Sequence, residues 1–74
     1  MNKDTVELAA QMVFEHVAYG ADLACVASDT MDTFTACGEV PYCTYDELCD
    51  AMYTINELRL GGVSYDKCID HLLG

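Results

Sequence analysis

The feature that most constrains the fold is a two-helix pattern in the second half of the chain, divided by Gly61-Gly62. Thr44, with Glu47 three residues later, has the spacing of a capping box, in which two residues exchange hydrogen bonds at a helix start. Gly61 is expected to end this helix in a left-handed conformation, and Ser64 to cap the next one. Two apolar stripes recur at helical spacing: Leu48, Ala51, Met52, Ile55 and Leu58 in the first segment, and Tyr65, Cys68, Ile69 and Leu72 in the second. The pattern predicts a helix hairpin with both stripes buried.

A longer helical pattern begins near the N-terminus. Asp4, with Glu7 three residues later, is expected to cap it. Gly20 falls inside the pattern, where glycine costs about 1 kcal/mol relative to alanine. We predict one helix that continues to about Val26 with a kink at Gly20. Its apolar side consists of Val6, Ala9, Ala10, Val13, Val17, Ala21 and Ala24.

The segment between these two patterns has the weakest periodicity. Ser28 or Asp29 could cap a short helix, with Gly38 ending it, but the Thr and Asp residues inside the segment favour a shorter, looser structure. Pro41 biases the residue before it toward extended backbone, so a connector is expected there. The segment is therefore predicted to form a short helix or a turn.

The predicted fold class is all-α: a small bundle of three principal helices, near 4–26, 45–60 and 64–73, plus a short helix or turn near 29–37. All 74 residues are expected to form a single helical domain, 1–74. The apolar fraction of 53% supports a packed core. A chain of this size buries only roughly 60% of its extended-chain surface. Pairing of two copies would bury more, so a homodimer is left open.

The net charge is the strongest functional signal. Thirteen acidic residues against three basic ones give −10 at pH 7. Direct nucleic-acid binding is disfavoured because phosphate contacts need Lys and Arg, and an anionic membrane surface is disfavoured for the same reason. The charge favours a basic protein partner. The plainer alternative is that it only keeps a small protein soluble.

Neither a signal peptide nor a membrane span is expected. The opening Met1-Asn2-Lys3-Asp4 is followed by no long uncharged apolar run. No stretch approaches the ~20 apolar residues that a transmembrane helix needs. A cytoplasmic location is therefore expected, with the five cysteines reduced.

The cysteines offer two weak alternatives to a binding function. Cys37, Cys43, Cys49 and His71 could converge on zinc, although no cysteine pair has the two-residue gap of a zinc knuckle or a redox motif. Cys68 and His71, three residues apart, could form a thiolate–imidazolium pair, but no third orienting group accompanies them. We expect no metal, no cofactor and no catalytic activity.

The candidate partner-binding residues are carboxylates that recur at about one-turn spacing on each predicted helix. At that spacing they stand roughly 6 Å apart, comparable with the phosphates of a nucleic-acid strand. The densest cluster lies on the third helix beside Tyr45 and Tyr53, aromatic residues of the kind that interfaces favour. The candidates are Glu7, Glu15 and Asp22 on the first helix, Asp46, Asp50, Tyr53 and Glu57 on the third, and Asp66 and Asp70 on the last.

Two resemblances bear on function. The segment 56–73, with Leu60-Gly-Gly-Val-Ser64 at its turn, resembles a helix-turn-helix, in which the helix after the turn enters the DNA major groove. Here that helix carries Asp66 and Asp70 with only Lys67 basic, so the likeness covers the geometry and not the chemistry. In length, charge and carboxylate spacing the whole chain is similar to small acidic phage-encoded inhibitors, the anti-CRISPR and anti-restriction proteins that imitate nucleic acid.

The expected function is therefore non-enzymatic. The acidic faces would dock on the basic, nucleic-acid-binding surface of a partner protein and block it. The alternative is a small helical adaptor or dimerisation module that uses a hydrophobic helix face, with the charge serving only solubility.

Overall fold

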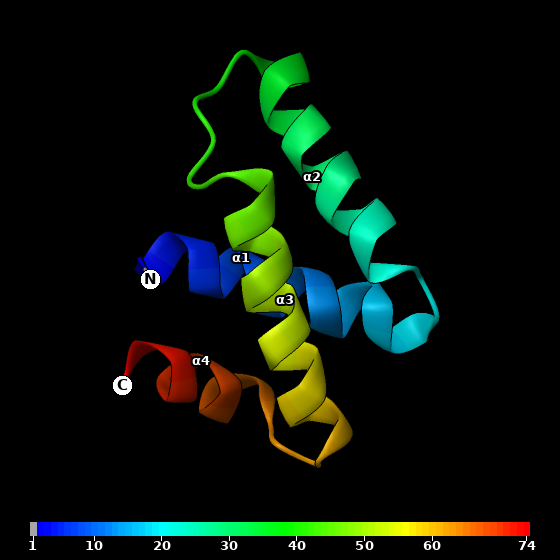
Figure 1. The fold of residues 1–74 in the computed structure, drawn as a ribbon, viewed down its shortest axis with the longest axis vertical. Helices are drawn as coiled ribbons and strands as arrows, with labels where there is room; N and C mark the ends of the chain where they lie inside the picture. Colours follow the sequence, from blue (N-terminus) through cyan, green and yellow to red (C-terminus); the bar gives the residue numbers. More distant parts are fainter. Residues whose placement is uncertain (1) are drawn as a thin grey trace.

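The computed structural model describes residues 2–74, which form an all-α structure (Figure 1). Its elements are α1 (Lys3–Glu15), the 3-10 helix η1 (Val17–Tyr19), α2 (Leu23–Cys37), α3 (Tyr45–Leu60) and α4 (Tyr65–Leu73). In Figure 1, α3 crosses in front of α1, and these two helices share the largest contact in the structure. α4 packs against α1 and α3, whereas α2 packs mainly against α3. The all-α prediction is confirmed for these residues.

The single helix expected to continue to about Val26 is in fact two helices. α1 ends at Glu15, and the chain then makes a short 3-10 turn. Gly20 adopts a left-handed conformation with φ of 101°, which a continuous helix does not allow. Asp22 then caps α2, because its Oδ2 accepts a hydrogen bond from the Cys25 backbone N–H at 3.1 Å. The combination of a glycine and a capping aspartate ends one helix and starts the next.

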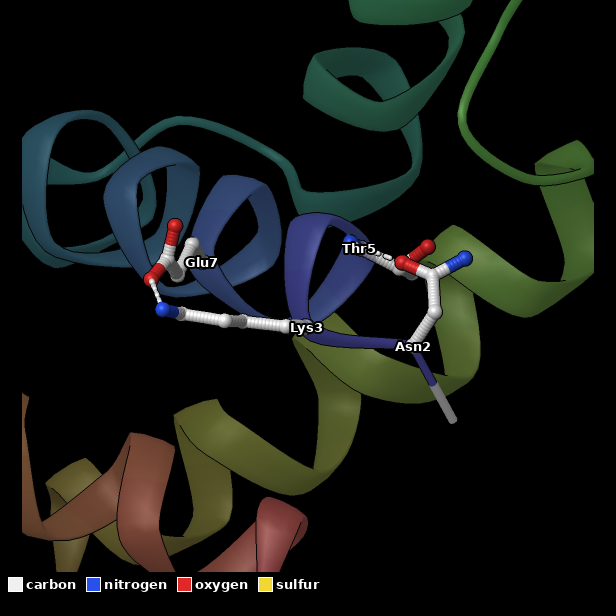
Figure 2. A network of polar contacts seen from close by, with 4 residues as sticks. All are labelled: Asn2, Lys3, Thr5 and Glu7. Atoms are coloured by element: carbon white, nitrogen blue, oxygen red, sulfur yellow. Dashed lines mark hydrogen bonds and ion pairs between the residues drawn. The ribbon is translucent and has the colours of Figure 1, made fainter.

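The expected cap at Asp4 is also wrong, since that residue lies inside α1. The N-cap is Asn2, whose Oδ1 accepts a hydrogen bond from the Thr5 backbone N–H at 2.8 Å (Figure 2). The Asn2 amide also donates to the backbone oxygen of Tyr42 at 3.3 Å. The start of α1 is therefore tied to the connector between α2 and α3.

The segment expected to be short and loose is the fifteen-residue helix α2. The threonines that argued against a long helix are accommodated in it. The hydroxyls of Thr30 and Thr33 donate to backbone oxygens one turn earlier, at 2.8 and 2.9 Å, and so remain compatible with the helix. Ser28 and Asp29 cap nothing, because both lie inside α2. Gly38 ends the helix as expected, with φ of 71°.

The core cluster lies mainly between α1 and α3, with one buried residue each from α2 and α4, and four of its nine residues are alanines. The α3 stripe residues Leu48, Ala51, Met52 and Ile55 are fully buried, as predicted. Ile69 and Leu72 of α4 are half-buried and pack against that core, whereas Tyr65 is exposed. On the N-terminal side, Ala21 and Ala24 are exposed because the helix they were assigned to does not exist. The other buried apolar residues are Val6, Ala9, Ala10, Val13, Ala27, Phe34 and Cys68.

The turn between α3 and α4 uses its second glycine. Gly61 has φ of −82°, so the left-handed residue predicted there is instead Gly62, with φ of 92°. The backbone N–H of Gly62 bonds the oxygen of Arg59, and that of Val63 bonds the oxygen of Leu58, at 2.9 and 3.0 Å. This is the Schellman arrangement, which satisfies the last carbonyls of the helix.

The start of α3 is the predicted capping box. The hydroxyl of Thr44 accepts from the Glu47 N–H at 3.2 Å, and the Glu47 carboxylate accepts from the Thr44 N–H at 3.0 Å. The hydrogen bond that the Thr44 backbone N–H donates to the Glu47 carboxylate is the main reason why the pKa of Glu47 lies below its ordinary value. The adjacent Thr44 hydroxyl lowers this pKa further. Because the folded pKa is the lower one, the stabilisation from Glu47 is present above its unfolded pKa and is lost as the pH falls through its folded pKa.

Replacing Thr44 by alanine is expected to cost about 1 kcal/mol of unfolding free energy, because an N-terminal donor of α3 loses its acceptor. Ser64→Ala is the matched control: Ser64 occupies the same position in α4 but makes no side-chain capping bond, so we expect a smaller change. Urea unfolding followed by circular dichroism measures both. Equal losses in the two variants would contradict the capping role of Thr44. A companion variant, Glu47→Gln, should differ from the parent less and less as the pH is lowered.

Candidate acidic binding surfaces

All thirteen carboxylate side chains are exposed, and the fold neutralises almost none of them. Within residues 2–74 the one ion pair joins Lys3 Nζ and Glu7 Oε1 at 3.8 Å, between side chains that are 73% and 47% exposed (Figure 2). The guanidinium of Arg59 donates instead to the neutral Asn56 Oδ1, at 2.9 and 3.2 Å. The negative charge of this protein is thus presented to solvent with little internal compensation.

Part of this charge supports helix starts. Asp22 and Glu47 form cap hydrogen bonds, and Asp4, Asp46 and Asp66 lie in first turns, where the helix dipole favours a negative charge. Six more carboxylates, within the part of the chain that the structure describes, have neither a capping bond, nor a first-turn position, nor a polar side-chain contact: Asp29, Asp32, Glu39, Asp50, Glu57 and Asp70. Helix capping therefore accounts for less than half of the acidic residues.

The predicted cluster on α3 forms a single exposed face, called here the α3 stripe: Asp46, Asp50, Tyr53 and Glu57. These residues follow one another at intervals of three or four, which places them on one side of a helix, opposite the buried α3 residues. Tyr53 is 62% exposed between the carboxylates. The stripe thus presents an aromatic side chain flanked by negative charge.

A second acidic surface, called here the acidic groove, lies between α1 and α4. It has a volume of about 460 Å³, with Leu8 and Ile69 as apolar lining. The ring of Tyr65 packs edge-on against Phe14 at 5.5 Å between centroids, which holds this wall in place. The remaining lining residues are Asp4, Glu7, Gln11, Tyr42 and Asp66. Carboxylates from two helices and two tyrosines therefore share one depression.

The structure brings together some of the predicted site residues and separates others. Glu7 and Asp66, 59 positions apart in the chain, both line the acidic groove. Asp22, which was predicted on the first helix, instead caps α2. Glu15, at the end of α1, and Asp70, on α4, are exposed but do not line the groove.

Sequence reasoning missed the contribution of Asp4, Gln11 and Tyr42 to the acidic groove. The spacing of Asp4, Glu7 and Gln11 does indicate one polar helix side. Nothing local to Tyr42 predicts that it lies beside α1, because that position depends on the path of the connector. Its ring packs against Phe34 at 4.9 Å, which fixes it there.

The cysteines do not assemble a reactive centre. All five are free, and the thiol of Cys68 is buried, which raises its pKa and favours the protonated form. Its Sγ donates to the backbone oxygen of Val63 at 3.8 Å, while His71 is exposed. The Asp22 carboxylate, through a hydrogen bond and its charge, raises the pKa of Cys25. Among residues 2–74 no group of three or more His, Cys, Asp or Glu side chains is arranged to hold a metal.

The thiols are expected to differ in reactivity by burial. Alkylation of the native protein should modify the exposed Cys37 readily, Cys25 more slowly because its raised pKa leaves less thiolate, and Cys68 only after denaturant is added. Mass spectrometry of peptides after timed alkylation measures this, with the fully denatured chain as the reference. If Cys68 reacts as fast in the native protein as in the denatured one, its burial is wrong.

No helix within residues 2–74 is both long enough and apolar enough to cross a membrane. Comparison with known proteins gives no match to a family model, to a curated protein or to a solved structure.

Proposed function

We propose that this protein is a non-enzymatic inhibitor that docks its acidic surfaces on the basic, nucleic-acid-binding face of a partner protein and blocks it. The observation that supports the proposal is the exposure of all thirteen carboxylates, against a single long ion pair within residues 2–74. Such inhibition is the mode of the nucleic-acid-mimicking anti-CRISPR and anti-restriction proteins. The partner is defined by its chemistry, a surface rich in Lys and Arg.

The uncompensated negative charge favours docking on a basic surface. Like charges one turn apart on a helix destabilise it by a few tenths of a kcal/mol per pair, and a net charge far from zero opposes the compact state. A basic surface removes that repulsion on binding. Complementary potentials also speed association by steering the two proteins together. The charge thus favours both the encounter and the complex.

The two acidic surfaces offer different contacts to such a partner. The α3 stripe is a convex row of carboxylates suited to a row of basic side chains. The acidic groove is concave, and its tyrosines provide ring faces on which an Arg or Lys side chain can lie, a cation–π contact worth about 0.5–1 kcal/mol at an exposed site. Together they suit a basic surface with at least one protruding side chain.

Salt dependence tests the proposal against the adaptor alternative. The Debye length shrinks from about 10 Å at 0.1 M salt to about 3 Å at 1 M, so an ion-pair interface should lose affinity by more than about tenfold over this range. The partner is captured at low salt and its affinity is then measured by calorimetry at both salt concentrations. Nucleic acid that binds the partner should displace this protein. Equal affinity at both salt concentrations, together with no displacement by nucleic acid, would contradict the proposal and favour hydrophobic docking.

A further inference from the structure

A third depression lies between α1 and α2, on residues that neither acidic surface uses apart from Leu8. Two adjoining hollows of about 260 and 220 Å³ share Met12, Thr30 and Thr33, so they form one continuous trough, called here the apolar groove. The first hollow is also lined by His16, Val26 and Asp29, and the second by Leu8, Phe34 and Glu39. The trough exists because α2 packs on α3 and makes little contact with α1.

We propose that the apolar groove binds an amphipathic helix of another protein, one with an apolar face flanked by Lys or Arg. This inference goes beyond the proposed function, because it uses another face of the molecule and an apolar contact. A groove between two diverging helices is a common receptor for a third, which inserts side chains spaced three or four residues apart.

The dimensions of the groove fit this occupant. From Val26 to Phe34 the α2 wall covers nine residues, whose eight steps of about 1.5 Å give roughly 12 Å, or a little over two turns of a docked helix. Met12 lies in the middle, shared by both hollows, and its flexible thioether adapts to differently shaped apolar side chains. Thr30 and Thr33 also line the groove, and their hydroxyls are already bonded to backbone oxygens of α2.

The charge of the groove favours a docked helix with basic residues on both sides of its apolar face. Asp29 belongs to the first hollow and Glu39 to the second, so each part of the groove carries an exposed carboxylate. A helix with basic residues beside its apolar face satisfies both. His16 also lines the first hollow, together with Asp29.

A second copy of this chain does not suit the groove. Two copies, each with a charge of −10, repel one another. The exposed face of α3 carries Asp46, Asp50 and Glu57, and α4 carries Asp66 and Asp70 with Lys67 as its one exposed lysine or arginine, so neither helix offers basic residues on both flanks. The occupant is therefore a different protein.

A synthetic peptide probe tests the proposal directly. The chain contains no tryptophan, so one Trp in the apolar face of a Leu/Lys amphipathic peptide of about 14 residues reports its own burial by fluorescence. A peptide of the same composition with a scrambled order serves as the charge-matched probe. In about 0.5 M NaCl, which screens ion pairs, we expect the amphipathic peptide to bind with a blue-shifted emission and the scrambled peptide to bind at least about tenfold more weakly.

The matched variants are Thr33→Arg and Thr35→Arg. Both residues are exposed on α2 and both substitutions add one positive charge, but only Thr33 lines the groove. Thr33→Arg should lower the affinity for the amphipathic peptide by about tenfold, and Thr35→Arg should change this affinity little. Equal binding of the two peptides, or equal effects of the two variants, overturns the proposal. The proposal is also overturned if sedimentation shows that the parent protein is a dimer and that Thr33→Arg is a monomer, because the groove would then hold a second copy of this chain. None of these results bears on the salt-sensitive docking of the acidic surfaces.

Discussion

Replacing Ile55 by alanine is expected to remove about 2–5 kcal/mol of unfolding free energy. Its side chain is fully buried in the core, so truncation to alanine leaves a cavity there. A domain of this size rarely has more than about 3–5 kcal/mol of net stability. The variant should therefore be largely unfolded or melt far below the parent. Thermal and urea unfolding, followed by circular dichroism, measure the change.

Two other alanine substitutions serve as comparisons for the stability loss expected of Ile55→Ala. Leu72→Ala should cost less than Ile55→Ala, because Leu72 is half-buried at the edge of the core. Leu60→Ala, on the same helix as Ile55 but 66% exposed, should change stability by less than about 0.5 kcal/mol. If Ile55→Ala melts within a degree or two of the parent, the assignment of the α3 core face is wrong. If Leu60→Ala is as damaging as Ile55→Ala, the assignment of the opposite face is wrong.

The second large effect is expected on partner binding. Reversing Asp50 and Glu57 to lysine changes the net charge from −10 to −6, since each reversal adds two positive charges. If the α3 stripe docks on a basic surface, two attractions become repulsions and affinity should fall by about tenfold or more. Asp46 is left unchanged, because a lysine in the first turn of α3 would oppose the helix dipole and disturb the fold.

A parallel pair and a control separate the two acidic surfaces. Reversing Glu7 and Asp66 to lysine tests the acidic groove with the same net charge of −6. Asp66 lies in the first turn of α4, as Asp46 does in α3, so circular dichroism must first show that this variant is folded. Reversing Asp32 and Asp70 to lysine gives the same net charge on exposed residues that belong neither to the acidic surfaces nor to the apolar groove. Loss of affinity in one pair but not in the control identifies the docking surface. Equal losses in all three variants would mean that only net charge matters and that neither surface is a site.

Local signals predicted the C-terminal half of the fold well. α3 begins after Thr44 and covers the residues expected, because a capping box and an apolar stripe depend on residues only a few positions apart. The same locality explains the error near Gly20. Apolar residues continue at helical spacing past that glycine, and this periodicity led to the prediction of one continuous helix. Gly20 and Asp22 together indicate a break there, but only as a glycine followed by a residue that can cap a helix.

The sequence by itself determined the all-α class, the core faces of α1 and α3, and the abundance of carboxylates that keeps the surface acidic. Only the tertiary structure decided which surfaces exist. Glu7 and Asp66 meet because α4 packs along α1, and the apolar groove is open because α2 rests on α3 instead of α1. The reason is physical: helix formation and capping depend on neighbouring residues, whereas the choice of packing partners depends on the apolar area buried by all the helices at once.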